Sequence, residues 1–200
     1  MSDSGEDPAR ACGGKSHIPG EAGIWLLIAG DLLMFSVLFV IFLVYRAGDL
    51  GIFQAGHARL NQTWGLVNTI LMLSSSWLVA TAIQAARRQM TRVVVACFGL
   101  AVLCGLGFIV VKVFEYSEKI RADLTLTTND FFMLYFSYTG IHLIHVVIGM
   151  GVLTTLMLYS RSGNFAGPKL RNLESGASFW HLVDLLWIVL FALLYLVGAK

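Results

Sequence analysis

Five long apolar segments constrain the fold of this chain more than any other feature. They cover approximately residues 23–45, 65–86, 93–114, 131–159 and 178–197. A helix that crosses a membrane needs about 20 mostly apolar residues, and each segment meets that length. Only 13% of the residues are charged and 57% are hydrophobic, whereas a soluble domain is about 25% charged. We therefore predict an all-α polytopic membrane protein: a bundle of five transmembrane helices within residues 21–200, preceded by a polar cytoplasmic N-tail at residues 1–20.

The distribution of basic residues predicts the orientation of this bundle. Lysine and arginine are more numerous in the N-tail and in the second and fourth loops than in the remaining loops and the C-terminus. The tightest cluster, Arg87, Arg88 and Arg92, lies in the second loop. Because cytoplasmic loops carry the excess of positive charge, we expect the N-terminus to be cytoplasmic and the C-terminus external. The first apolar segment is too long for a cleavable signal, so we expect it to be a retained helix.

Several classes of function are disfavoured by the sequence. The net charge is +2 and no basic stripe is present, so we predict no nucleic-acid partner. Three cysteines do not make a disulfide framework. We find no nucleophile–base arrangement, no phosphate-cradling loop and no paired-carboxylate active site, and we predict no catalytic residue in this chain.

Ionisable residues inside the apolar segments are the candidate functional groups. A charge at the centre of a membrane helix costs about 2.5–3.5 kcal/mol. His181 and Asp184 are three residues apart and share a helix face. At 1.5 Å per residue, Asp31 lies about 12 Å from the cytoplasmic side, and His145 and Asp184 roughly 9 Å. His181 is nearer the interface and His142 nearer the midplane. We predict a polar layer in which Asp31 or Asp184 pairs with His145, either for proton transfer or for helix packing alone.

Two other polar groups receive structural interpretations. Lys112 and Glu115 end the third apolar segment near the external side. We expect them to form an interfacial ion pair with snorkelling side chains. Asn68 and Thr69, in the second segment, are typical of close packing between membrane helices.

Metal binding and transport are the remaining alternatives. His142 and His145 share a helix face, which would suit a haem or a metal ion. A bis-histidine haem, however, needs two histidines that face each other at one depth, and membrane di-iron sites need more histidines. We therefore predict no metal or cofactor in this chain, with a haem-bearing membrane cytochrome as the alternative. The absence of internal repeats and of broken helices argues against a transporter.

Two histidine motifs give the chain a resemblance to a known family. The segment Trp180–Trp187 (W-H-L-V-D-L-L-W) resembles the W-H-F-V-D-x-x-W signature in the last helix of subunit III of the haem–copper oxidases. The segment Thr139–Gly149 (T-G-I-H-L-I-H-V-V-I-G) resembles the family's T-G-F-H-x-x-H-V-x-x-G. Shorter matches, in the same order and spacing, are Asn68-Thr69, Glu115-Tyr116, and Glu174, seven residues before His181.

The resemblance covers almost the whole chain beyond the N-tail, with two departures. Where the family has S-E-x-x-F-F, this chain has Gly30–Phe35 (G-D-L-L-M-F), so Asp31 offers a carboxylate on a shorter arm. The large form of the family has seven helices, whereas this chain has five predicted ones. The lipid-filled cleft that the first two helices form in the large form is therefore not implied here.

The resemblance implies a non-catalytic accessory subunit. Such a subunit packs on the catalytic subunit I, stabilises it during turnover and supports proton uptake, while haem and copper reside in the partner. The short form also resembles the branch associated with nitric oxide reductases, so the catalytic subunit of such a reductase is the alternative partner. We further expect contacts with other subunits and membrane lipids, with a bound phospholipid as an option, in a bacterial cytoplasmic (inner) membrane.

Overall fold

The computed structural model describes residues 22–196, and all regular elements in that range are helical. The predicted N-tail at residues 1–20 lies outside the described residues. Five of the helices are long and apolar enough to cross a membrane, which confirms the prediction of an all-α protein with five spans. The elements are α1 (Ala22–Gly48), α2 (Leu50–Ala58), α3 (Gln62–Arg87), α4 (Thr91–Arg121), α5 (Asp130–Ser160) and α6 (Pro168–Phe191), followed by a π-helical turn at Ala192–Leu196.

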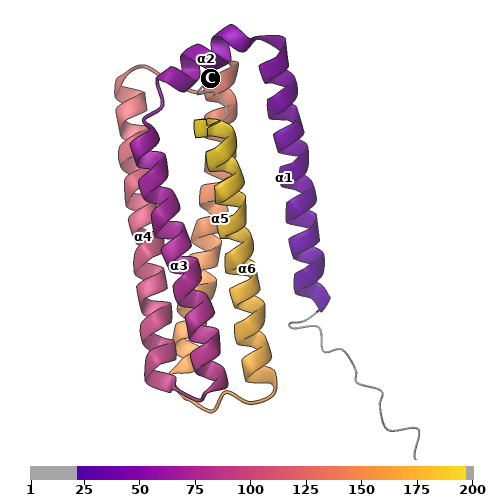
Figure 1. The fold of residues 1–200 in the computed structure, drawn as a ribbon, viewed down its shortest axis with the longest axis vertical. Helices are drawn as coiled ribbons and strands as arrows, with labels where there is room; N and C mark the ends of the chain where they lie inside the picture. Colours follow the sequence, from indigo (N-terminus) through magenta and orange to yellow (C-terminus); the bar gives the residue numbers. More distant parts are fainter. Residues whose placement is uncertain (1–21, 197–200) are drawn as a thin grey trace, which may run out of the picture.

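Four of the long helices form a compact bundle, and the first lies at its edge. Helices α3, α4, α5 and α6 run side by side, whereas α1 stands apart and α2 crosses one end of the molecule (Figure 1). Among the five spans, α1 is the least buried and α6 the most. Helix α6 contacts α3, α5 and α1. Residues on α6 can therefore reach partners on three other helices.

The start of α6 and the presence of the short helix α2 could not be read from the hydropathy pattern. Helix α6 begins at Pro168 rather than at the predicted residue 178, because proline suits the first helical turn, where its missing N–H is not needed. The polar residues that follow Pro168 hide this start from a search for apolar segments. Helix α2 was not predicted at all. Its start is capped by the Asp49 side chain, which accepts a hydrogen bond from the Ile52 N–H at 3.1 Å.

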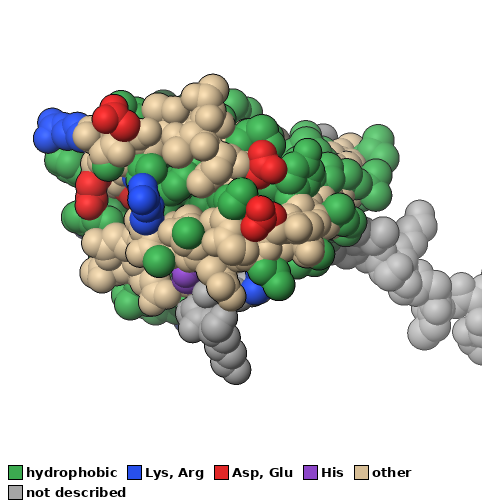
Figure 2. Space-filling model, turned by 90° about the horizontal axis from the view of Figure 1, so that it is seen from above, with side chains coloured by type: hydrophobic (Ala, Val, Ile, Leu, Met, Phe, Trp, Pro, Cys, Tyr) green, Lys and Arg blue, Asp and Glu red, His purple; other side chains and the backbone are tan. Residues whose placement is uncertain are grey.

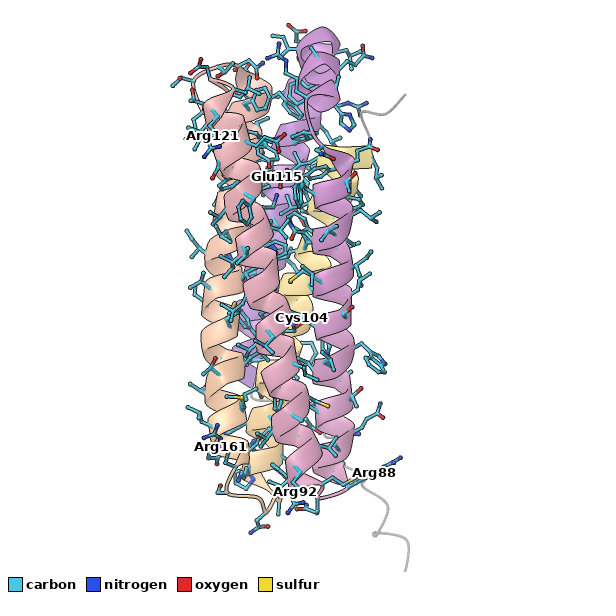
Figure 3. All side chains as sticks on the ribbon, turned by 90° about the vertical axis from the view of Figure 1, so that its left-hand side faces the viewer. Arg88, Arg92, Cys104, Glu115, Arg121 and Arg161 are labelled. Atoms are coloured by element: carbon cyan, nitrogen blue, oxygen red, sulfur yellow. The ribbon has the colours of Figure 1, made fainter. Side chains whose placement is uncertain are left out.

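Charged side chains lie mainly at the two ends of the bundle. Arg88, Arg92 and Arg161 lie near one end and Arg121 near the other (Figure 3). Viewed onto the end that carries α2, acidic and basic side chains gather on the end face with hydrophobic ones around it (Figure 2). This arrangement is that of a protein whose sides face lipid and whose ends face water. The cytoplasmic location of the N-terminus stays a prediction.

A tryptophan on α6 packs directly against glycines of two other helices. Trp180 is fully buried. A Cβ atom added at Gly149 in α5 would lie 2.8 Å from Cε3 of Trp180, and one at Gly105 in α4 would lie 3.3 Å from its Cη2. Real Cβ atoms do not approach other heavy atoms as closely as 2.8 Å. The position of α6 against α5 therefore depends on the absence of a side chain at Gly149.

We expect Gly149→Ala to lower the thermal unfolding temperature of the purified protein in detergent. Its new methyl group must displace the Trp180 ring, and overpacking of this kind costs about 1–3 kcal/mol. Gly140→Ala is the matched control in the same helix, since a Cβ there meets nothing within 4 Å. The control gains helix propensity of up to about 1 kcal/mol and should leave the unfolding temperature unchanged or raised. Equal shifts for the two variants would contradict the packing role of Gly149.

Candidate functional site

An acid and a histidine from two helices face each other inside the molecule. Nε2 of His145 in α5 lies 3.6 Å from Oδ1 of Asp31 in α1. Nδ1 of the same ring lies 2.9 Å from the carbonyl oxygen of Ile141. Because a carbonyl oxygen can only accept, Nδ1 carries a hydrogen, and the Nε2 edge faces the carboxylate. Of the two partners predicted for His145, the structure places Asp31 beside it.

This geometry suits a pair that holds one proton. With Nδ1 protonated, a neutral ring presents a lone pair at Nε2 to the Asp31 carboxylate, which also has only lone pairs to offer. The contact becomes favourable when one further proton sits on either group. The Asp31 and His145 side chains are 21% and 16% exposed, so neither is sealed off. Solvent can therefore reach both side chains of the pair.

The His145 side of this pair lies at the middle of a long helix. His145 is the midpoint of α5, about 22 Å from either end of the helix. The sequence estimate placed it near the cytoplasmic side because it measured depth against a ~30 Å core. A 31-residue helix is about 46 Å long and extends beyond that core. The ends of α5 therefore lie outside the core, and the depth of the pair in the membrane stays a prediction.

Asp184 belongs to a second group, between α3 and α6. Nδ1 of His181 lies 2.6 Å from the Ser76 hydroxyl oxygen, and the same hydroxyl lies beside the Asp184 carboxylate. Asp184 is 5% exposed, and its Oδ1 atom has no hydrogen-bond partner among the described residues. Asp184 and His181 thus share Ser76, and Asp184 does not take the place beside His145.

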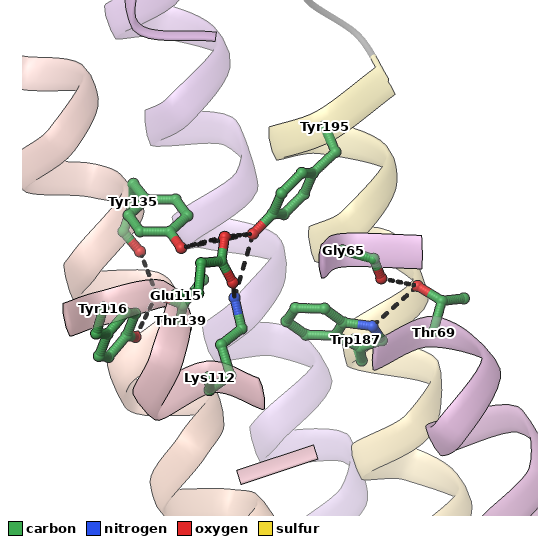
Figure 4. Close-up of polar contacts among 9 residues, drawn as sticks. All are labelled: Gly65, Thr69, Lys112, Glu115, Tyr116, Tyr135, Thr139, Trp187 and Tyr195. Atoms are coloured by element: carbon green, nitrogen blue, oxygen red, sulfur yellow. Dashed lines mark hydrogen bonds and ion pairs between the residues drawn. The ribbon is translucent and has the colours of Figure 1, made fainter. Parts of the chain in front are cut away.

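The third group is a buried ion pair that two tyrosines complete (Figure 4). Nζ of Lys112 donates to Oε2 of Glu115 at 2.8 Å. The hydroxyls of Tyr135 and Tyr195 donate to Oε1 of Glu115 at 2.8 and 2.5 Å. Each side chain of the ion pair is only 1% exposed. The pair predicted from the sequence is present, but its side chains do not snorkel to the interface, because both face the interior of the bundle.

Aromatic rings link this ion pair to the other polar residues in the core. Nζ of Lys112 lies 4.7 Å from the centre of the Trp187 ring, a favourable cation–π distance. The Trp187 indole N–H donates to Oγ1 of Thr69 at 3.1 Å. His142 packs against the Trp187 ring at 5.4 Å between centroids. Asn68 and His142 are fully buried, and their side-chain nitrogen and oxygen atoms lack hydrogen-bond partners in the described structure.

Glu174 joins the ends of two helices. Its carboxylate accepts a hydrogen bond from Nη2 of Arg87 at 2.8 Å. This ion pair connects the last turn of α3 with an early turn of α6. Arg87, one of the three arginines from which we predicted the orientation, therefore also takes part in helix packing.

The sequence did not predict three of these hydrogen-bond partners. They are Ser76, which contacts His181, and the two tyrosines Tyr135 and Tyr195, which donate to Glu115. A signal for the tyrosines was present, because a tyrosine within an apolar segment needs a partner for its hydroxyl. Their choice of Glu115 could not be read from the sequence. Tyr195 reaches it from the π-helical turn that follows α6.

Hydrogen bonds, ion pairs and ring contacts between helices make up this arrangement. Within residues 22–196, no group of three or more histidine, cysteine, aspartate or glutamate side chains is placed to hold a metal ion. His142 is enclosed by the rings of Phe108 and Trp187, and His145 faces Asp31.

The sequence is similar to a known protein family and to several characterised proteins. The family model of cytochrome c oxidase subunit III matches residues 18–199. A cytochrome c oxidase subunit 3 of Synechocystis sp. is 28% identical over 91% of this chain and 82% of its own length. A quinol oxidase subunit 3 of Bacillus subtilis is 26% identical over 88% of this chain and 86% of its own length. A heme-copper oxidase subunit I+III of Aeropyrum pernix is 26% identical over 88% of this chain and 22% of its own length.

We expect Lys112→Met to destabilise the purified protein by about 3–5 kcal/mol, because it leaves the Glu115 carboxylate buried without its cation. The double variant Lys112→Met/Glu115→Gln removes both charges and should recover much of that loss. Unfolding in mixed micelles, analysed as a double-mutant cycle, gives the coupling between the two residues. Additive effects would contradict the assignment of a tightly coupled buried pair.

Proposed function

This chain belongs to the cytochrome c oxidase subunit III family, and on that premise we propose that it stabilises an oxygen-reducing catalytic subunit and assists its proton uptake. As a family member it is an accessory subunit III of a haem–copper oxidase and associates with a subunit I. The observation that carries the proposal is the family match over residues 18–199, which includes every polar group described above.

The Asp31–His145 pair is the group we assign to proton uptake. Its two side chains come from different helices, face each other and are both partly exposed. The 3.6 Å between Nε2 and Oδ1 exceeds the usual 2.7–3.2 Å of a hydrogen bond. This separation agrees with the shorter arm of Asp31 where the family has glutamate.

The stabilising role rests on the buried groups of α3 to α6. The cluster of Lys112, Glu115, Tyr135 and Tyr195 connects α4, α5 and the turn after α6. The Arg87–Glu174 pair adds a link between α3 and α6. A bundle fixed in this way offers a rigid surface to a partner subunit in the membrane.

We further propose that the partner complex reduces oxygen. The relatives from Synechocystis sp. and Bacillus subtilis are named as subunits of a cytochrome c oxidase and a quinol oxidase. Haem and copper then reside in subunit I, and the complex lies in a bacterial cytoplasmic membrane with lipids around it. Assembly with a nitric oxide reductase stays the alternative prediction.

Co-purification tests this assignment directly. The tagged chain is isolated with its partners in mild detergent, and the complex is assayed for oxygen and for nitric oxide reduction. Oxygen reduction supports the proposal, whereas nitric oxide reduction alone supports the alternative partner. A Soret band from the isolated chain, at one haem per chain, would instead identify a haem-bearing cytochrome.

We expect Asp31→Ala to leave the haem spectrum of the purified complex intact while it slows proton uptake or shortens the active lifetime during turnover. The reason is that the substitution removes a group of the proton-holding pair and no ligand of a metal. Asp130→Ala, at an exposed position in the first turn of α5, is the control and should behave as the wild type. Loss of haem from the Asp31→Ala complex would contradict a purely accessory role.

A further inference from the structure

We propose that a groove between α3 and α6 is a water-filled inlet that ends at Asp184 and lets this carboxylate exchange protons with the aqueous phase. The inlet lies on different helices from those that carry the Asp31–His145 pair, and it does not depend on whether the partner complex reduces oxygen or nitric oxide. It gives a function to the second polar group, which the proposal above does not use.

The groove has room for water and a polar lining. Its volume is about 330 Å³, and a water molecule in the liquid takes about 30 Å³. Two alanines and an isoleucine complete the wall. Arg87 and Glu174 pair with each other, Ser178 donates to the Glu174 carbonyl and His181 contacts Ser76. Water can add further hydrogen bonds to these groups and lipid chains cannot, so the lining favours water as the occupant. The polar lining residues are Gln84, Arg87, Glu174, Ser178 and His181.

The mouth of the groove lies at the ends of the helices. Arg87 and Glu174 form their ion pair there, and the arginine side chain is 61% exposed. From Glu174, the groove follows α6 for seven residues to His181, a distance of about 10 Å. A charged pair at the entrance and a histidine at the inner end make a polar route into an otherwise apolar span.

Beyond His181 the route continues to a carboxylate that lacks a partner. His181 contacts the Ser76 hydroxyl at 2.6 Å, and this hydroxyl lies beside Asp184. Oδ1 of Asp184 has no hydrogen-bond partner among the described residues, although the residue is only 5% exposed. A buried acceptor without a donor is costly, and a water molecule from the groove would supply that donor.

The inlet ends at this carboxylate. One turn further along α6, Trp187 is fully buried and gives its N–H to Thr69, so its ring closes the route. A proton that enters passes from water to an oxygen atom of Asp184 and leaves by the same way, and no other bond changes. Asp184 thus binds and releases protons at the inner end of the inlet, and the inlet does not continue across the membrane.

Cysteine accessibility in the intact complex tests whether the groove holds water. In a chain whose Cys12, Cys97 and Cys104 are replaced by alanine, Ala80→Cys introduces a thiol in the groove wall. The control is Ala96→Cys on the exposed side of α4. The two positions lie at one level, since each is five residues from the contact between Ser75 and Ala101 in antiparallel helices.

We expect a membrane-impermeant cationic methanethiosulfonate to modify Ala80→Cys on the order of 100-fold faster than Ala96→Cys, because a thiolate is strongly disfavoured against lipid. Asp184→Cys should also react, and Ser178→Trp, which fills the groove, should protect it. If Asp184→Cys fails to assemble, Ser76→Cys takes its place at the same depth.

Three outcomes would overturn the inlet. Equal slow modification of Ala80→Cys and Ala96→Cys would mean that lipid or a partner subunit covers the groove. Fast modification of Ala80→Cys together with an unreactive thiol at residue 184 or 76 would mean that water stops short of Asp184. A reactive thiol that Ser178→Trp does not protect would mean that water arrives by another way. None of these results bears on co-purification with an oxidase, so the two proposals fail independently.

Discussion

The buried ion pair between Lys112 and Glu115 is the interaction on which the rest of the bundle depends. Both side chains are 1% exposed, and breaking such a pair costs several kcal/mol because it leaves a lone charge in a medium that cannot solvate it. Each charge therefore requires partners from other helices. Tyr135 and Tyr195 supply hydroxyl donors to Glu115, and the requirement for these contacts aligns α5 and the end of α6 with α4.

The same constraint accounts for the other polar groups. Arg87 with Glu174, Asp31 with His145, and Ser76 with His181 each join two different helices. Hydrophobic burial gives little direction to helices in lipid, since lipid tails are as apolar as the side chains. Polar contacts and the close fit of Trp180 onto Gly149 therefore determine which helix faces lie together. Packing therefore accounts for many of the ionisable groups that this accessory subunit keeps in its spans.

The three polar groups differ in the solvent exposure of their side chains, and we assign them different roles on this basis. The Lys112–Glu115 cluster is sealed and acts as a fixed structural element. Asp31 and His145 are partly exposed. Asp184 is buried but adjoins a groove with a polar lining. This family member thus carries a structural cluster and two groups to which we assign proton exchange, at different places in one bundle.

The amino-acid sequence by itself determined the class of the fold, the five spans and the family. These follow from local properties, because a long apolar segment has few alternatives to a membrane helix. It also singled out the ionisable residues inside the spans, since a charge in such a segment is costly wherever it lies. Only the tertiary structure decided how they pair: Asp31 with His145, Asp184 with Ser76, and Glu115 with two tyrosines. Partner choice depends on helix rotation and length, and α6 starts at Pro168 in a polar stretch that hydropathy does not reveal. A periodic apolar pattern says which residues lie on one helix face, but not which neighbouring helix that face meets.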